Sequence, residues 1–259
     1  MTLRFGGLGV ALITLFDGRG EVDAEATAQH ASRLVDHGVR FVLVCGSTGE
    51  AWSLTPEERT RLIAGVRSAL PPTVPVLAGT GADSPLIAGE LTRQARDAGA
   101  DAVLALSPAG SRDLGAYYGS VARAAGDLPA LAYHFPTMSS PGIPVDVLSQ
   151  LPIQGLKDSS GDAARLEAEL TTWDGSVFVG STSTIELART RGGAGAILGI
   201  ANAEPETCAA ALEGDGSAQE RLAALGPHAG RDFPLGIKEL TSARFGTPTV
   251  MRGRAPLRA

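Results

Sequence analysis

The chain has 259 residues, of which 44% are hydrophobic and 19% are charged, and this is enough apolar material for a large globular core. A formal net charge of -6 and the lack of a basic cluster argue against nucleic acid or an anionic membrane as partner, so a small molecule is expected. The N-terminal apolar run is short and interrupted by Gly and Thr, which predicts neither a signal peptide nor a membrane span and favours a cytoplasmic location.

Eight short apolar runs rich in Val, Ile, Leu and Ala recur along the chain. Each run is continuously hydrophobic rather than alternating, as is typical of parallel strands that are covered on both faces. The runs predict strands at 10–16, 39–46, 75–81, 101–108, 129–136, 153–160, 176–181 and 194–202.

Helical patterns lie between these runs and begin with recognisable caps. Asp23 precedes the first pattern, Thr55 and Pro56 open the second, and residues 83–85 open the third in the same way. After the last predicted strand, further helices are expected at 204–213, 217–229 and 234–245.

Eight strand-then-helix units predict an α/β fold, the (β/α)8 or TIM barrel, whose usual size is about 250 residues. We expect residues 1–214 to form the barrel and residues 215–259 to form a C-terminal helical extension packed on it. The alternative is a doubly wound open sheet, which also alternates strands and helices. It is disfavoured because no GxGxxG follows the first strand and because eight units exceed what such a domain needs.

Function in a barrel gathers at the carboxyl ends of the strands. The loop 46–50, GSTGE, follows the second predicted strand and presents two hydroxyls between glycines, an arrangement that can hold a small carboxylate. Alternatively, Ser47 or Thr48 could simply bond the backbone of a turn. Ser159 after the sixth strand and Thr182 after the seventh lie at the same rim and are further substrate-binding candidates.

Lys157 and Lys238 are the only two lysines among the 22 residues that are Lys or Arg. Lys157 lies on the sixth predicted strand, where burial would lower its pKa and free the amine to attack a ketone. The alternatives are an ion pair with Asp158 and a side chain that extends to solvent. Lys238 lies on a helical pattern next to Glu239, outside the barrel rim, and we interpret it as solvated or structural.

Tyr133 would reach the rim from the fifth strand, and a phenol beside an imine can pass protons to and from a substrate oxygen. The four histidines show no spacing typical of metal ligands, so no metal site is expected.

Taken together, these segments resemble the family of dihydrodipicolinate synthase and N-acetylneuraminate lyase, the pyruvate-dependent class I aldolases and lyases. The similarity covers nearly the whole chain and rests on several ordered motifs. They are VALITLFDGRGEVD, GSTGE followed by LTPEER, PVLAGTGA, GADAVLALSP, YHFP, GLKDSSGD and GAGAILGIAN.

The resemblance implies roles for individual residues. Lys157 would form the Schiff base with pyruvate or a 2-oxo acid, and Tyr133 would move protons, with Ser47 as the third member of the catalytic set. Ser47 and Thr48 would together bind the substrate carboxylate. Two further positions match the backbone and wall of the pyruvate pocket, namely Gly180 and Ile197.

Two departures from the family pattern bear on the substrate. Ala109 and Gly110 follow Pro108, where dihydrodipicolinate synthases typically carry paired tyrosines. Met138 stands where those synthases have an arginine for the aldehyde's carboxylate, which suggests a second substrate without an anion at that point. His134 replaces the usual asparagine of the motif.

We therefore predict a Schiff-base aldolase or lyase that cleaves or forms a C–C bond between pyruvate and a small aldehyde, acting on a 2-oxo acid such as a 2-oxo-3-deoxy sugar acid. No cofactor is expected, because the lysine supplies the electron sink. The alternatives are a dehydratase or hydratase-aldolase, dihydrodipicolinate synthase itself, and a non-catalytic sensor of 2-oxo acids. The resemblance also implies a homo-oligomer, a dimer or a tetramer.

Overall fold

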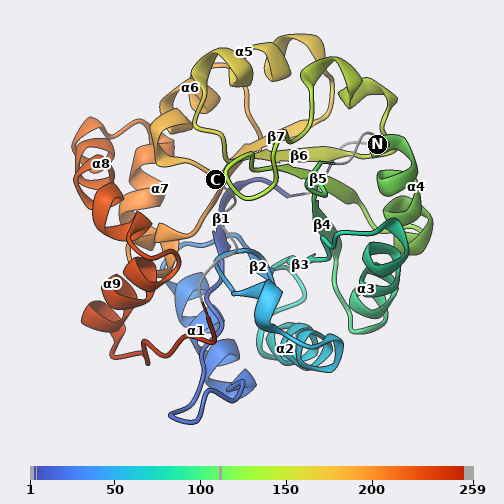
Figure 1. Cartoon of the computed structure of the whole chain (residues 1–259). Coiled ribbons are helices and arrows are strands. Elements are labelled where there is room, and N and C mark those ends of the chain that lie inside the picture. The colour runs from blue at the N-terminus through green and yellow to red at the C-terminus, as the bar shows by residue number, and fades with distance from the viewer. Residues whose placement is uncertain (1–2, 4, 111–112, 254–259) are drawn as a thin grey trace.

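A computed structural model describes residues 3, 5–110 and 113–253 of the chain. Eight parallel strands hydrogen bond in sequence order and close into a barrel, with the first strand paired to the last (Figure 1). The predicted TIM barrel is therefore confirmed. The strands are β1 (Gly7–Ala11), β2 (Phe41–Val44), β3 (Val76–Gly79), β4 (Ala102–Leu106), β5 (Ala130–His134), β6 (Gly155–Asp158), β7 (Ser176–Val179) and β8 (Gly195–Leu198).

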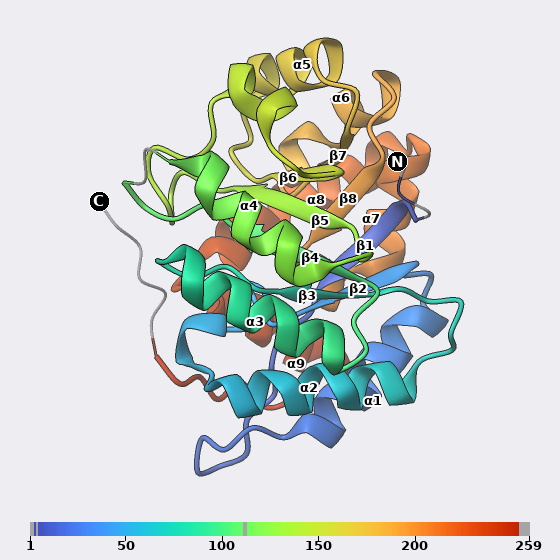
Figure 2. The same cartoon turned by 90° about the vertical axis from the view of Figure 1, so that its right-hand side faces the viewer.

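Helices form a layer around the outside of the barrel (Figures 1 and 2). They are α1 (Ala24–Asp36), α2 (Pro56–Ala69), α3 (Pro85–Asp97), α4 (Leu114–Ala125), α5 (Ala163–Thr172), α6 (Ile185–Thr190), α7 (Pro205–Glu213), α8 (Gly216–Gly230) and α9 (Leu235–Phe245). The predicted caps are confirmed: Asp23 accepts from Ala26 N, and Thr55 forms a capping box with Glu58. Ser84 caps the third helix in the same way, by accepting from Ile87 N.

The inside of the barrel is filled by side chains rather than open. Phe41 and Phe178 pack edge to face there, with ring centroids 5.6 Å apart. Gly9 leaves room for Phe41, because a Cβ at this position would overlap the phenylalanine ring. This filled interior supports the polar groups that lie at the carboxyl ends of the strands.

The first strand differs from its prediction. It spans Gly7–Ala11 rather than 10–16, and the following residues form a buried loop. Two long-range hydrogen bonds replace ladder pairing there: Ile13 N donates to Asn202 Oδ1 at 3.1 Å, and Thr14 Oγ1 donates to Gly49 O at 2.7 Å. The apolar run continues past the strand because this loop is packed against other parts of the chain, not because it belongs to the sheet.

Three helices follow β8. The last barrel helix, α7, ends at Glu213, and α8 and α9 then pack side by side on the outside of the barrel next to it (Figure 1). The division into a barrel of residues 1–214 and an extension of residues 215–259 stays a prediction, and residues 254–259 lie outside the described part. No helix in the described ranges is long and apolar enough to cross a membrane.

Candidate active site

Lys157 and Tyr133 are register partners on β6 and β5, and both side chains turn into the barrel at its rim. Lys157 is 4% exposed, and its Nζ lies 4.3 Å from the centroid of the Tyr133 ring. Lys157 therefore does not extend to solvent. Its amine lies beside a phenol inside the molecule.

Burial lowers the pKa of Lys157 to about 7. Asp158, the neighbour considered as an ion-pair partner, turns to the other side of β6. Its carboxylate accepts from Ser160 N at 2.8 Å and lies 4.0 Å from Arg165 Nε. The sequence order of Lys157 and Asp158 thus places the two charges on opposite faces of the strand. A substantial fraction of the lysine is consequently uncharged at neutral pH.

Burial acts on Tyr133 in the opposite direction and raises its pKa to about 12, although hydrogen bonds with Ser159 and Ser47 lower it in part. Ser159 Oγ donates to the Tyr133 hydroxyl at 3.3 Å. The phenol is therefore protonated throughout the physiological range. It can donate a proton to a substrate oxygen without first changing its own charge.

Gly180, at the end of β7, makes room for the lysine. A Cβ at this position would overlap Ser159 Oγ and lie 2.8 Å from Lys157 Cε. The absence of a side chain is thus a steric requirement of the Lys157 conformation.

The GSTGE loop is framed by two residues with left-handed backbone, Cys45 (φ 57°) and Glu50 (φ 55°). Such conformations cost about 1–3 kcal/mol each and tend to cluster at functional sites. Between them, Ser47 and Thr48 face different cavities. The turn therefore presents two hydroxyls on two sides.

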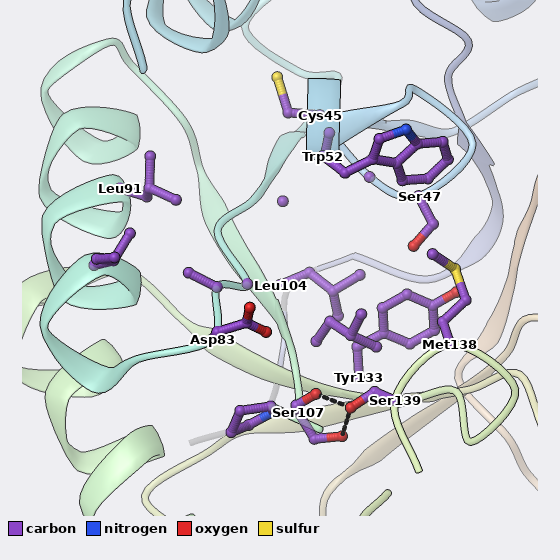
Figure 3. Close-up of a pocket in the computed structure, with 18 of the residues that line it drawn as sticks. Cys45, Ser47, Trp52, Asp83, Leu91, Leu104, Ser107, Tyr133, Met138 and Ser139 are labelled. Carbon is purple, nitrogen blue, oxygen red and sulfur yellow. Dashed lines mark hydrogen bonds between the residues drawn. The ribbon is translucent and has the colours of Figure 1, made fainter. Parts of the chain in front are cut away.

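Two cavities meet at Tyr133. The smaller, about 280 Å³, contains the lysine. The larger, about 460 Å³, opens on the other side of the tyrosine, between the ends of β2, β3 and β4 (Figure 3). The predicted site residues of the smaller cavity are Thr48, Tyr133, Lys157, Ser159, Gly180 and Thr182.

Ser47 and Met138 line the larger cavity together with Tyr133, and Figure 3 shows these three side chains close to one another. Ile197 lies in the apolar cluster inside the barrel and lines neither cavity. The structure therefore brings seven of the other predicted positions around Tyr133 and leaves Ile197 apart.

Sequence reasoning missed the residues that hold the GSTGE loop from behind. Lys238 is fully buried, and its Nζ lies 2.5 Å from Glu50 Oε1 and donates to Val250 O at 2.6 Å. The interpretation of Lys238 as solvated is wrong and the structural one is right, but the partner is Glu50 rather than Glu239. The pKa of Lys238 is lowered by burial and raised in part by Glu50.

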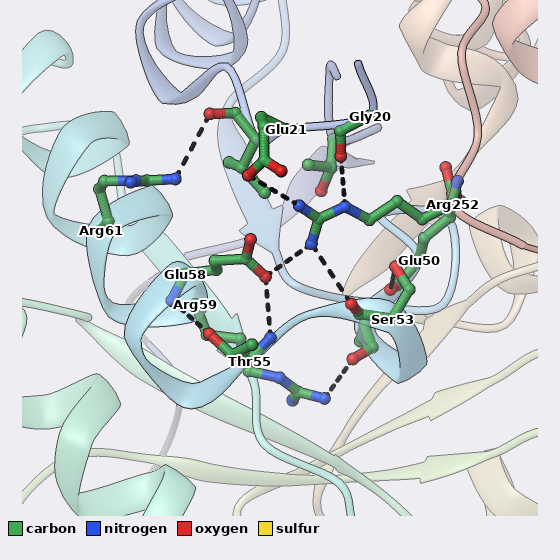
Figure 4. Close-up of polar contacts among 12 residues, drawn as sticks. Gly20, Glu21, Glu50, Ser53, Thr55, Glu58, Arg59, Arg61 and Arg252 are labelled. Carbon is green, nitrogen blue, oxygen red and sulfur yellow. Dashed lines mark hydrogen bonds and ion pairs between the residues drawn. The ribbon is translucent and has the colours of Figure 1, made fainter. Parts of the chain in front are cut away.

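Arg252 completes this support (Figure 4). Its backbone N donates to Glu50 Oε2 at 2.9 Å, and its guanidinium donates to Glu58 Oε2 at 2.8 Å and to Gly20 O. Glu50 was visible in the sequence as a charged residue directly after the glycine-framed hydroxyls. Its partners were not, since they come from the far end of the chain.

His134 has a structural explanation. Ile143 N donates to its Nδ1 at 2.9 Å, and burial lowers the pKa of the imidazole to about 4. The ring is therefore neutral and anchors the segment that follows β5. Among the described residues, no group of three or more His, Cys, Asp and Glu side chains could hold a metal ion.

Known proteins are similar to this chain in both sequence and fold. Residues 4–224 match the model of the dihydrodipicolinate synthetase family. A 4-hydroxy-tetrahydrodipicolinate synthase of Phenylobacterium zucineum is 36% identical over 239 residues, which are 85% of this chain and 81% of that enzyme. An enzyme of the same name from Synechococcus sp. strain WH7803 is 40% identical over 136 residues, 51% of this chain and 45% of the relative.

Among solved structures, a prophage protein of the dihydrodipicolinic acid synthase family from E. coli K12, crystallised with pyruvate, has a TM-score of 0.89 to this chain. The two sequences are 25% identical, and the match covers 99% of this chain and 94% of the prophage protein. The resemblance recognised in the motifs is confirmed. The chain belongs to the dihydrodipicolinate synthetase family, which is a family of pyruvate-dependent class I aldolases.

Proposed function

We propose that the chain joins pyruvate to an aldehyde, or cleaves the resulting 2-oxo acid, through an imine on Lys157. The observation that carries the proposal is the Lys157 amine, which is buried at the barrel rim, has a pKa lowered to about 7, and lies 4.3 Å from the Tyr133 ring. A neutral amine is the nucleophilic form, and a neighbouring phenol can supply the protons that the reaction needs.

The chemistry follows from these two groups. The neutral amine attacks C2 of the 2-oxo acid, and the resulting hydroxyl leaves as water after taking a proton, for which Tyr133 is the nearby donor. The protonated imine withdraws electrons, so that loss of a C3 proton or cleavage of the C3–C4 bond leaves an enamine. In the synthetic direction the enamine carbon attacks the aldehyde, whose oxygen takes up a proton, and water then releases the amine.

We propose that Ser47 and Thr48 bind the substrate carboxylate. Ser47 lines the larger cavity with Tyr133, and Thr48 lines the smaller cavity with Tyr133 and Lys157. Ser159 and Thr182 line the lysine cavity and are proposed as further polar contacts. Ser47 also lines the larger cavity together with Tyr133, which supports its place in the catalytic set.

The residues of the site identify the aldehyde less closely than they identify pyruvate. The two cavities favour different aldehydes. An aldehyde in the lysine cavity would meet the hydroxyls of Ser159, Ser181 and Thr182, which would suit a polyhydroxy aldehyde such as that of a 2-oxo-3-deoxy sugar acid. Met138 supplies no charge for a carboxylate-bearing aldehyde, which argues against 4-hydroxy-tetrahydrodipicolinate synthesis. A dehydratase or hydratase-aldolase would use the same imine, and a sensor would form no product.

The proposal includes a homo-oligomer, either a dimer or a tetramer, in the cytoplasm. Membership of the dihydrodipicolinate synthetase family is the observation that supports this part of the proposal.

Borohydride trapping tests the proposal. The protein is incubated with pyruvate, reduced, digested and examined by mass spectrometry, and the adduct mass is expected on Lys157. Lys157→Ala should lose the adduct and essentially all turnover, while Glu239→Gln, a change in a partly exposed ion pair with Arg231, should keep trapping at Lys157. An unmodified Lys157, or full activity of Lys157→Ala, would exclude the imine. An adduct without turnover of any aldehyde would favour the sensor.

A further inference from the structure

We propose that the larger cavity beside Tyr133 receives the aldehyde, and that this aldehyde carries an uncharged apolar substituent, an alkyl chain or an aryl ring. The inference rests on the proposed function, because it assumes that the enamine forms on Lys157. It goes beyond that function in naming the subsite and the chemical class of the second substrate.

The larger cavity adjoins the reaction centre at Tyr133, the residue that lines both cavities. Adjacent residues of one turn divide between them, Ser47 in the larger and Thr48 in the smaller. An aldehyde held in the larger cavity would therefore present its carbonyl at Tyr133, next to an enamine held on Lys157. The phenol is then available to the oxygen that gains a proton when the new bond forms.

The walls of the larger cavity are mainly apolar and come from several elements. Figure 3 shows Leu104 and Leu91 on the side away from the GSTGE loop and Trp52 above Ser47 and Met138. Large apolar side chains in the lining are Trp52, Leu54, Ile87, Leu91, Leu104, Leu106 and Met138. A volume of about 460 Å³ with such walls is in the range of small-molecule sites and gains binding energy from apolar surface.

The charged groups of this cavity do not favour an anionic substituent. Arg59 turns its guanidinium to the backbone, where it donates to Ala51 O and to Gly79 O, the latter at 3.4 Å. Asp83 also lines the cavity and would repel a carboxylate. Beside the reacting tyrosine, Met138 offers a thioether, which is a soft apolar contact.

Small residues follow β4 beside the larger cavity. Ala109 lines the cavity with a methyl group only, and Gly110 follows it with φ 66°. The small side chain at residue 109 thus leaves more of the cavity to a ligand. A bulky side chain at residue 109 would fill part of the volume from the β4 side.

A series of aldehydes tests the inference with the full chain and pyruvate. Acetaldehyde, butanal, hexanal and hydrocinnamaldehyde vary the apolar substituent, while glyceraldehyde and succinic semialdehyde supply hydroxyls and a carboxylate. The expected kcat/KM rises by up to about fourfold for each added methylene until the cavity is filled. Glyceraldehyde and succinic semialdehyde should be the poorest substrates.

Two leucines of α3 give a matched pair of variants. Leu91 lines the cavity, whereas Leu86 is 81% exposed and does not. Leu91→Ala should lower kcat/KM for hexanal by about tenfold and leave acetaldehyde within about twofold. Leu86→Ala should change neither value. Ala109→Phe gives a second approach in case Leu91→Ala folds poorly, and it should exclude hydrocinnamaldehyde while sparing acetaldehyde.

Borohydride trapping of pyruvate on Lys157, run with every variant, distinguishes a failure of the apolar subsite from a failure of the imine mechanism. If Lys157 is trapped but kcat/KM does not depend on chain length, or glyceraldehyde or succinic semialdehyde is the best substrate, the apolar subsite is wrong and the imine stands. Equal effects of Leu91→Ala and Leu86→Ala would also overturn the subsite. If Lys157 is not trapped at all, the proposed function itself fails.

Discussion

Lys157 and Tyr133 show how one physical cause prepares two groups for different tasks. Burial opposes charge, so it lowers the pKa of the amine to about 7 and raises that of the phenol to about 12. At neutral pH the site therefore contains an amine that can attack and a phenol that can donate. In the uncharged fraction of the lysine, neither group has to lose a proton to bulk water before the reaction.

The pH dependence of imine formation follows from the lysine. Because only the neutral amine attacks, the second-order rate with pyruvate should fall by about tenfold per pH unit below 7 and level off above it. Rapid mixing followed by borohydride quench measures this rate. Tyr133→Phe should keep the inflection but lower turnover by roughly 10²–10⁴-fold. A rate that still rises steeply between pH 8 and 10 would mean that the amine has an ordinary pKa.

Gly180→Ala tests whether the lysine needs the empty space beside it. The added methyl would overlap Ser159 Oγ and crowd Lys157 Cε, so we expect the amine to be displaced and imine formation to fall by about 100-fold. Gly18→Ala is the control, since a Cβ at Gly18 meets nothing within 4 Å. Both variants should give native circular dichroism. Undiminished trapping in Gly180→Ala would show that the packing is not needed.

At the scale of elements, the turn that presents Ser47 and Thr48 is held by α9. Glu50 of this turn has a fully buried carboxylate, and the ammonium of Lys238 on α9 balances its charge. Removing one partner of a buried pair leaves an uncompensated charge in the interior, which costs more than the pair itself contributes.

Lys238→Met should therefore lower the free energy of unfolding by about 3–5 kcal/mol. Urea unfolding measures the change, and the KM for pyruvate should rise because the turn is less well held. Glu239→Gln on the same helix is the control, since its partner Arg231 is 53% exposed and surface pairs contribute about 1 kcal/mol or less. Equal losses in the two variants would show that the Glu50 contact has no special weight.

Much of the barrel could be predicted because its signals are local. Continuous apolar runs and caps such as Asp23 and Thr55 are encoded within a few neighbouring residues, and family motifs added Lys157 and Tyr133. The first strand was misplaced because Leu12–Phe16 is as apolar as a strand, although loop contacts bury it. Periodicity reports burial and does not say which neighbour causes it.

The features of the site that could not be predicted from the sequence depend on contacts between residues far apart in the chain. Lys238 and Glu50 are 188 positions apart, and no local pattern links them. The division of Ser47 and Thr48 between two cavities depends on the left-handed backbone at Cys45, which its residue type does not suggest.

At the scale of the whole molecule, Arg252 ties the last described segment to the first and second βα loops. It contacts Gly20, Glu50 and Glu58 in one place, with its side chain 19% exposed (Figure 4). Three regions far apart in sequence thus meet behind the proposed carboxylate site.

Arg252→Ala should lower the free energy of unfolding by about 1–3 kcal/mol, because the charge-assisted bonds to Glu58 and Gly20 are lost. It should also speed cleavage of the GSTGE region in limited proteolysis. Arg231→Ala is the matched control, since Arg231 pairs with Glu239 at the surface. Identical proteolysis of the two variants would contradict the stabilising role of Arg252.

This arrangement has a consequence for how the protein matures during translation. Glu50 leaves the ribosome early, but Lys238 and Arg252, which hold it, are made 188 and 202 residues later. A nascent chain can therefore fold much of its barrel while the turn that presents Ser47 and Thr48 still lacks its supports. The turn is expected to reach its final form only after Arg252 has left the ribosome and packed behind Glu50.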